Sequence, residues 1–96
     1  MTTRSSIEQI LREHQPRLRR NFKVREIGIF GSYATDQANE ESDVDLLVEF
    51  SEPVGWEFTD VHDYLERILD RKVDLATVGA LKPQLRDSIM RQVVYI

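Results

Sequence analysis

Hydrophobic residues recur along the chain at two kinds of spacing, and the changes between them divide it into successive elements. Spacings of three and four residues predict amphipathic helices, whereas short apolar runs or strict alternation predict strands. The predicted order is helix, strand, strand, helix, strand, helix. This order indicates an α/β (α+β) fold in two layers, in which helices cover a small mixed β-sheet.

The first predicted helix begins near Ser5, because Ser5 and Glu8 fit the spacing of a capping box. We expect Pro16 to end or kink this helix, since the residue before a proline avoids the helical region. His14 lies on the apolar side of this helix. We interpret it as a histidine packed in the core and not as a metal ligand. The apolar stripe recurs at helical spacing at Ile7, Ile10, Leu11 and His14.

Three segments have the pattern of strands. Residues 24–30 and 44–50 form the first two, separated by a polar, turn-rich stretch at residues 36–42. Residues 73–76 form a shorter third strand. In the second strand, alternate apolar residues are expected to share one face of the sheet, and these residues are Val44, Leu46, Val48 and Phe50.

The second long helix is predicted over residues 56–70, and it is followed by Arg71 and Lys72, where cations suit the helix dipole. We expect its first aromatic residues, Trp56 and Phe58, to pack in the core, and His62 to be solvated. Pro83 is well placed as the first residue of a last helix, with an apolar stripe at Leu81, Leu85 and Ile89.

The C-terminal residues 93–96 fit either a helix tail or a final strand. With 96 residues and no visible linker or repeat, the chain is expected to form one domain, residues 1–96. No apolar segment reaches the length of a signal peptide or a membrane span. We therefore expect a cytoplasmic protein that makes no contact with a membrane.

The net charge and the absence of cysteine argue against some classes of function and of site. The net charge is −4 and the chain has no basic block, which argues against direct binding of nucleic acid through a cationic surface. The absence of cysteine removes disulfides and thiolate metal sites, and it fits a reducing compartment. With only two histidines, a zinc site is not expected.

Two aspartates break the apolar pattern where the second strand begins. Asp43 and Asp45 precede and enter an apolar run, although aspartate is disfavoured in strands and a buried carboxylate is costly unless it is paired or holds a metal. Alternate strand residues share a face about 6.5 Å apart. Two carboxylates placed in this way can converge on one or two hard cations, and oxygen ligands suit Mg²⁺.

Asp74 repeats this anomaly in the third strand, and it adds a third carboxylate if that strand lies beside the second. Clustered acids repel one another, so without a metal at least one should bind a proton more readily. Upstream, Gly31 and Ser32 follow the first strand, where a glycine allows close approach and a helix start offers N–H groups to phosphate. Carboxylates beside a phosphate seat indicate nucleotidyl or phosphoryl transfer.

Each of these features alone has a structural explanation, as a helix cap, a loop or a salt-bridged strand residue. Their order is much more specific, because Gly31-Ser32 followed by Asp43-Val44-Asp45 resembles the signature of the DNA polymerase beta nucleotidyltransferase superfamily. Over nearly all 96 residues the chain resembles the minimal branch of that superfamily, often called MNT or MntA-like. The resemblance implies the polymerase-beta-like palm fold.

The resemblance also implies roles for particular residues. Gly31 and Ser32 are expected to hold the nucleoside triphosphate, ATP. Asp43, Asp45 and Asp74 are expected to bind divalent metal, two Mg²⁺ ions in all, with Asp74 also helping to activate the attacking hydroxyl. Two such ions stabilise both the attacking and the leaving oxygen of an in-line displacement.

The chain departs from the family's pattern at Thr35-Asp36, where a basic or polar residue followed by glycine is common. An acid near a triphosphate is unfavourable unless it points away or meets a metal. Asp36 therefore bears on how well the chain binds a nucleotide.

Members of the minimal branch typically pair with a HEPN-domain ribonuclease toxin. The resemblance implies a Mg²⁺-dependent antitoxin that transfers AMP from ATP to a tyrosine hydroxyl of that toxin. Two alternatives stay open: an antitoxin that masks the toxin stoichiometrically without catalysis, and a small-molecule nucleotidyltransferase that needs a partner subunit.

Overall fold

The chain follows the predicted order of helices and strands, with one short strand added near the C-terminus. The structure is a computed structural model and describes residues 2–96. Two short 3₁₀ helices, η1 and η2, follow β1 and β3. The elements are α1 (Arg4–Phe22), β1 (Val24–Phe30), η1 (Gly31–Tyr33), β2 (Val44–Phe50), α2 (Trp56–Leu69), β3 (Val73–Thr77), η2 (Val78–Ala80), α3 (Pro83–Gln92) and β4 (Val94–Tyr95).

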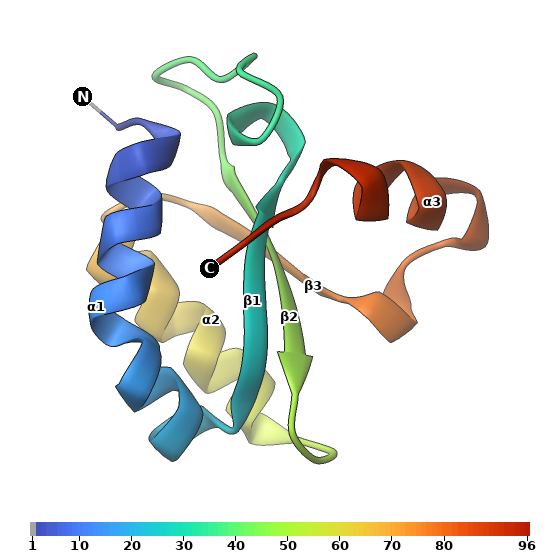
Figure 1. Ribbon diagram of the computed structural model, residues 1–96. Coiled ribbons are helices and arrows are strands. Elements are labelled where there is room, and N and C mark those ends of the chain that lie inside the picture. Colours follow the sequence, from blue (N-terminus) through green and yellow to red (C-terminus); the bar gives the residue numbers. More distant parts are fainter. Residues whose placement is uncertain (1) are drawn as a thin grey trace.

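The four strands form one mixed sheet in the order β3-β2-β1-β4. β1 runs antiparallel to both β2 and β4, and β2 runs parallel to β3. The C-terminal segment is therefore a strand, and it pairs with Gly28 and Ile29 of β1. Figure 1 shows α1 and α2 together on one side of the sheet and α3 on the opposite side. The predicted α/β class with a mixed sheet is confirmed.

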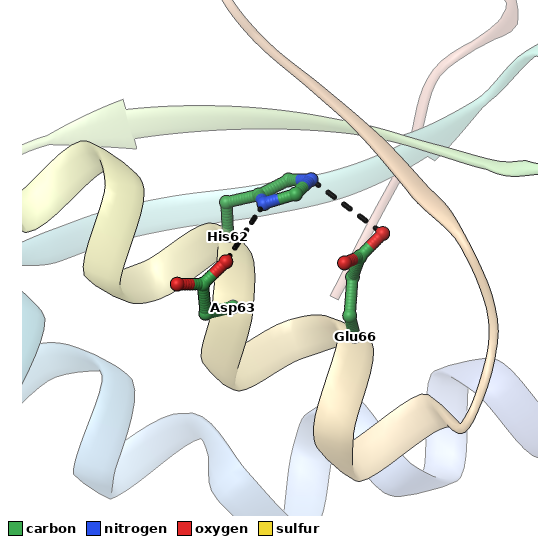
Figure 2. A group of neighbouring side chains, drawn as sticks. All are labelled: His62, Asp63 and Glu66. Carbon is green, nitrogen blue, oxygen red and sulfur yellow. Dashed lines mark hydrogen bonds and ion pairs between the residues drawn. The ribbon is translucent and has the colours of Figure 1, made fainter.

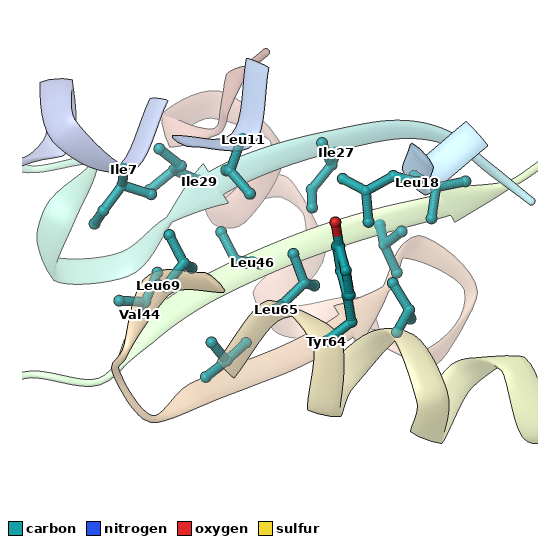
Figure 3. Close-up of a cluster of buried hydrophobic side chains, with 14 of the residues drawn as sticks. Ile7, Leu11, Leu18, Ile27, Ile29, Val44, Leu46, Tyr64, Leu65 and Leu69 are labelled. Carbon is teal, nitrogen blue, oxygen red and sulfur yellow. The ribbon is translucent and has the colours of Figure 1, made fainter. Parts of the chain in front are cut away.

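The hydrophobic core lies between the sheet and the pair of helices α1 and α2 (Figure 3). Alternate residues of β2 enter it, as the sequence pattern predicts, and Val44, Leu46 and Val48 have no exposed surface. Burying one such side chain stabilises the fold by about 1.5–3 kcal/mol. The fully buried residues that meet them from the helices are Ile7, Leu11, Leu18, Val61 and Leu65.

The start of α1 differs from the prediction, because the capping box is formed by Thr3 and Ser6 and not by Ser5 and Glu8. The backbone N–H of Ser6 donates to the Thr3 hydroxyl at 3.1 Å, and the N–H of Thr3 donates to the Ser6 hydroxyl at 2.9 Å. A serine hydroxyl thus takes the place that Glu or Gln usually fills in this motif.

Pro16 is predicted to end or kink the first helix, and the prediction that it ends the helix is wrong, because α1 continues through it to Phe22. A proline removes one N–H from the helical ladder and crowds the preceding turn, which costs about 3 kcal/mol. Leu11 and Leu18, on either side of Pro16, are both fully buried. Their packing offsets this cost, and the helix ends instead at Lys23, which is left-handed with φ 59°.

The prediction for Trp56 is also wrong, because its side chain is 84% exposed. Trp56 is the first residue of α2 and lies ahead of that helix's buried stripe. Phe58 is half-buried and packs against Phe50, with ring centroids 6.4 Å apart. His14 is half-buried and hydrogen-bonded to the hydroxyl of Tyr64, so it packs between the two helices as expected.

α3 begins at Pro83, as predicted, but contributes no buried residue. Leu85 of its expected apolar stripe is 51% exposed, because α3 stands apart from α1 and α2 (Figure 1). Within residues 2–96, neither this helix nor any other is long and apolar enough to cross a membrane.

Candidate active site

Asp45 and Asp74 lie side by side at the start of two parallel strands. Asp45 is the second residue of β2, Asp74 is the second residue of β3, and the two are directly paired in the register. Paired residues of neighbouring strands are about 4.8 Å apart. Because Val44 and Leu46 point into the core, Asp45 and Asp74 belong to the opposite face of the sheet, which we call the site face. The condition under which Asp74 adds a third carboxylate, that its strand lies beside the second, is therefore met.

Asp43 precedes β2 by one residue and completes the acidic group. Asp43 and Asp74 are exposed, whereas Asp45 is half-buried. Partial burial raises the pKa of Asp45 to about 6, and the negative charges of Asp74 and then Asp43 contribute to the same shift. One member of the group therefore binds a proton more readily than an ordinary aspartate, as expected for clustered acids.

Gly31 brings the end of β1 against this acidic group. Phe30 pairs with Asp45, and Gly31 follows with φ +72°, a left-handed conformation that favours glycine. A Cβ atom on Gly31 would overlap the carboxylate of Asp45 and lie 2.8 Å from its Cγ. Both the backbone conformation and the close approach require glycine here. The predicted Gly31-Ser32 seat and the acid at Asp45 are therefore neighbours.

Asp36 turns toward the start of α1. Its side chain is 83% exposed, and a carboxylate oxygen lies 3.9 Å from Nη1 of Arg4, which also donates to the carbonyl of Ala34 at 3.1 Å. Asp36 has φ 59°, again in the left-handed region. Glycine, which the family pattern leads us to expect at this position, adopts this conformation freely, and aspartate is among the other residues that tolerate it best.

Two residues of the site were not singled out from the sequence. The side-chain oxygen of Gln92, at the end of α3, accepts a hydrogen bond from the N–H of Gly31 at 2.7 Å. Arg71 contacts the loop that leads to Asp43. Sequence spacing cannot reveal the contact between Gly31 and Gln92, which are 61 positions apart. From the sequence alone, Arg71 is recognisable only as a cation at the end of a helix.

The donor set suits a hard divalent cation. Asp43, Asp45 and Asp74 offer only carboxylate oxygens, which Mg²⁺ prefers. The pKa of Asp45 is raised first by partial burial and then by the charges of Asp74 and Asp43, and a bound cation would offset both effects. The three side chains share one end of the site face, although their oxygens do not form a set within 4.8 Å of one another.

Among residues 2–96, the possible metal ligands whose donor atoms do lie within 4.8 Å of one another are on α2. They are His62, Asp63 and Glu66 (Figure 2). Two of these side chains, His62 and Glu66, already form hydrogen bonds that hold the fold together. Nε2–H of His62 donates to the carbonyl of Val73 at 2.9 Å, and the N–H of Val73 donates to Glu66 at 2.9 Å. The pair thereby attaches the start of β3 to α2, next to Asp74.

The prediction that His62 is solvated is therefore wrong, since it is half-buried with both ring nitrogens in contact. Partial burial lowers the pKa of His62, but its hydrogen bonds to Val73 and Asp63 and the charge of Glu66 outweigh this effect. The net result is a raised pKa.

Comparison with known proteins agrees with this geometry. The Nucleotidyltransferase domain family matches residues 11–96. Protein adenylyltransferase MntA of Thermococcus cleftensis is 45% identical over 97 residues, which cover 100% of this chain and 98% of that protein. A candidate minimal nucleotidyltransferase of known structure is 29% identical with a TM-score of 0.73, over 95% of this chain and 89% of the other.

Two complexes share the fold at lower identity. A toxin–antitoxin crystal structure with AMP-PNP has a TM-score of 0.68 at 23% identity, over 98% of this chain and 72% of the other. A tri-AMPylated Shewanella oneidensis HEPN toxin in complex with an MNT antitoxin gives a TM-score of 0.58 at 22% identity, over 96% and 66%. At these identities the likeness shows the fold alone.

The mixed sheet, the acidic group on its site face and the neighbouring glycine define a nucleotidyltransferase. The chain belongs to the nucleotidyltransferase domain family, in the minimal, MntA-like branch.

Proposed function

We propose that the chain is a Mg²⁺-dependent protein adenylyltransferase that acts as the antitoxin of a HEPN-domain toxin. Its reaction transfers AMP from ATP to a tyrosine hydroxyl of the partner. The observation that carries the proposal is the meeting of Asp45 and Asp74 on neighbouring strands, with Gly31 packed against Asp45.

Gly31 and Ser32 hold the triphosphate in this proposal. The left-handed conformation of Gly31, which glycine adopts freely, places the Gly31-Ser32 seat against the acidic group. The hydroxyl and backbone N–H of Ser32 are donors of the kind that phosphate oxygens accept. Asp36 supports this role, because its carboxylate turns toward Arg4.

Asp43, Asp45 and Asp74 hold the divalent metal. When bound there, two Mg²⁺ ions would supply charge neutralisation for the transfer. The chain's own contribution is mainly positioning, as is general for phosphoryl transfer. The half-buried Asp45 is fixed between Gly31 and β3, whereas Asp43 and Asp74 are exposed to the substrates.

In the transfer step, the acceptor hydroxyl oxygen forms a bond to the α-phosphorus of ATP. The bond from that phosphorus to the bridging oxygen breaks, and pyrophosphate leaves. Asp74 takes the proton of the hydroxyl, because it is exposed and lies beside the acid that binds metal. The products are pyrophosphate and a protein carrying an adenylylated tyrosine.

The names of relatives support a protein acceptor and a HEPN partner. The relative from Thermococcus cleftensis is called a protein adenylyltransferase and spans the same length. A chain with the same fold occurs in complex with an AMPylated HEPN toxin. These likenesses favour transfer to protein over transfer to a small molecule.

Co-expression with a HEPN-domain toxin tests the proposal through the intact mass and ribonuclease activity of that toxin. We expect the toxin to gain the mass of one or more AMP groups and to lose ribonuclease activity. Asp74→Asn is the matched control, because it is nearly isosteric and should leave the toxin unmodified and active. A toxin inhibited without added mass in both samples would support stoichiometric masking instead.

A further inference from the structure

The peptide groups on both sides of Asp43 are held by a single two-residue segment. The carbonyl of Ser42, on one side, accepts a hydrogen bond from Arg71 at 2.9 Å. The N–H of Val44, on the other side, donates to the carbonyl of Lys72 at 2.9 Å. The position of the backbone at Asp43 therefore depends on the position of residues 71–72.

The guanidinium of Arg71 has two further contacts in the same region. The same terminal nitrogen lies 2.7 Å from the carbonyl of Glu40 and 3.1 Å from the hydroxyl of Tyr33. Tyr33 is only 4% exposed and ends η1, the helix that starts with Gly31. One guanidinium thus joins the buried end of η1 to the last part of the loop before Asp43.

The turn between α2 and β3 directs the side chain of Arg71 toward the loop before Asp43. Asp70 is left-handed, with φ 51°, and ends α2, so that the chain changes direction at Arg71. Three residues later the same segment reaches Asp74. Arg71 is therefore attached at one end to the strand of Asp74 and contacts, at the other, the loop of Asp43.

We propose that Arg71 is a positioning residue that sets the separation of Asp43 from Asp74 for metal binding. Residues that orient metal ligands in this way are worth about 10–100-fold in metal affinity or activity. The inference rests on the proposed function, because it presumes that Asp43, Asp45 and Asp74 hold the metal.

A purely electrostatic role for Arg71 makes the opposite prediction. Arg71 is a cation that contacts the carbonyl next to Asp43, so Coulomb's law alone predicts tighter binding of a divalent cation once it is removed. Positioning predicts weaker binding. Lys72→Gln is a matched control, because it removes one positive charge at an exposed neighbouring side chain and leaves the carbonyl that holds Val44.

The test is a Mn²⁺ titration followed by electron paramagnetic resonance in the presence of AMP-PNP, with thermal melts to confirm that each variant is folded. We expect Arg71→Gln to weaken Mn²⁺ binding about 10-fold and Lys72→Gln to change it less than about twofold. Arg71→Lys keeps the charge but lacks the planar fork, and should also bind more weakly than wild type; it replaces Arg71→Gln if that variant does not fold.

Two results would overturn the inference, and they are distinguishable. If wild type binds Mn²⁺ and the Arg71 variants bind it equally or more tightly, the positioning role fails while the proposed function stands. If wild type itself binds no Mn²⁺ with AMP-PNP, the proposed metal site fails, and the inference fails with it.

Discussion

The two faces of β2 have opposite effects on the stability of the fold. Leu46 points between α1 and α2, where it is fully buried in the apolar core. Its neighbour Asp45 points to the site face, where burial and two nearby carboxylates raise its pKa to about 6. One residue stabilises the native state by burying apolar surface, and the other adds repulsion to it.

This difference shows where function resides in the molecule. The core face follows the ordinary preferences of a strand, whereas the site face violates them at Asp45 and Asp74. A local rule that is broken while the rest of the strand obeys it marks a functional residue. Substitutions on the two faces should therefore separate stability from activity.

The largest expected effect is the loss of activity in Asp45→Asn. Because residues that merely orient metal ligands are worth 10–100-fold, losing a ligand should lower transfer more than about 100-fold. The substitution removes a repelled charge, so in metal-free buffer at neutral pH the free energy of unfolding should rise by about 1 kcal/mol after solvent screening. Partner mass and thermal melts in EDTA measure the two effects. Full activity at ordinary Mg²⁺ would refute the metal assignment.

Leu46→Ala should have the opposite effects, a large loss of stability with no loss of activity in the folded protein. Truncating a fully buried leucine costs about 2–5 kcal/mol of stability, through lost burial and the cavity that remains. At low temperature, the fraction that stays folded should transfer AMP at the wild-type rate per folded molecule. Denaturant unfolding and an activity assay on the same sample provide both numbers. A fully folded but inactive variant would show that the two faces are not separable.

Gly31→Ala tests the contact between the proposed phosphate seat and the acidic group. Alanine at φ +72° costs about 1–2 kcal/mol, and its methyl group would displace the Asp45 carboxylate. We expect transfer to fall about 10-fold or more, the effect of misplacing a metal ligand. Gly79→Ala is the matched control, because a Cβ there meets nothing within 4 Å. Equal activity in the two variants would contradict the close approach.

The smallest effect is expected for Asp36→Gly. Glycine relieves the left-handed conformation, and the lost contact with Arg4 is worth little because Asp36 is exposed. The free energy of unfolding should change by at most about 1 kcal/mol. Nucleotide affinity, measured by titration with AMP-PNP, should stay close to that of wild type. A large gain in affinity would mean that Asp36 faces the triphosphate.

Most of the fold could be predicted, because β1, β2 and β3 have a strong local pattern, whereas the two-residue β4 has none. β1 and β2 begin and end where the apolar runs do, and Asp74 lies beside Asp45 as expected. The errors at Pro16 and Trp56 have one cause: local preference does not reveal how much of a helix is buried by the rest of the chain. Leu18 supports the helix beyond Pro16, whereas Trp56 is left uncovered by residues 2–96.

The candidate site was predictable only in its acids and its glycine, whose residue types conflict with strand preference or indicate a close approach. The residues that position them were not. Arg71 and His62 look like ordinary polar residues of a helix and its end, and their partners are backbone groups of distant segments. Contacts of this kind depend on the tertiary fold and leave no periodic signal.

In the proposed function, Gly31, Ser32 and the acidic group form one metal-dependent nucleotide site. Calorimetric titration of the wild-type chain with AMP-PNP, once in EDTA and once in Mg²⁺, tests it most directly. Triphosphate and carboxylates repel each other, so AMP-PNP should bind at least about 10-fold more tightly in Mg²⁺ than in EDTA. Equal affinity in the two buffers, or no binding in either, would contradict the claim.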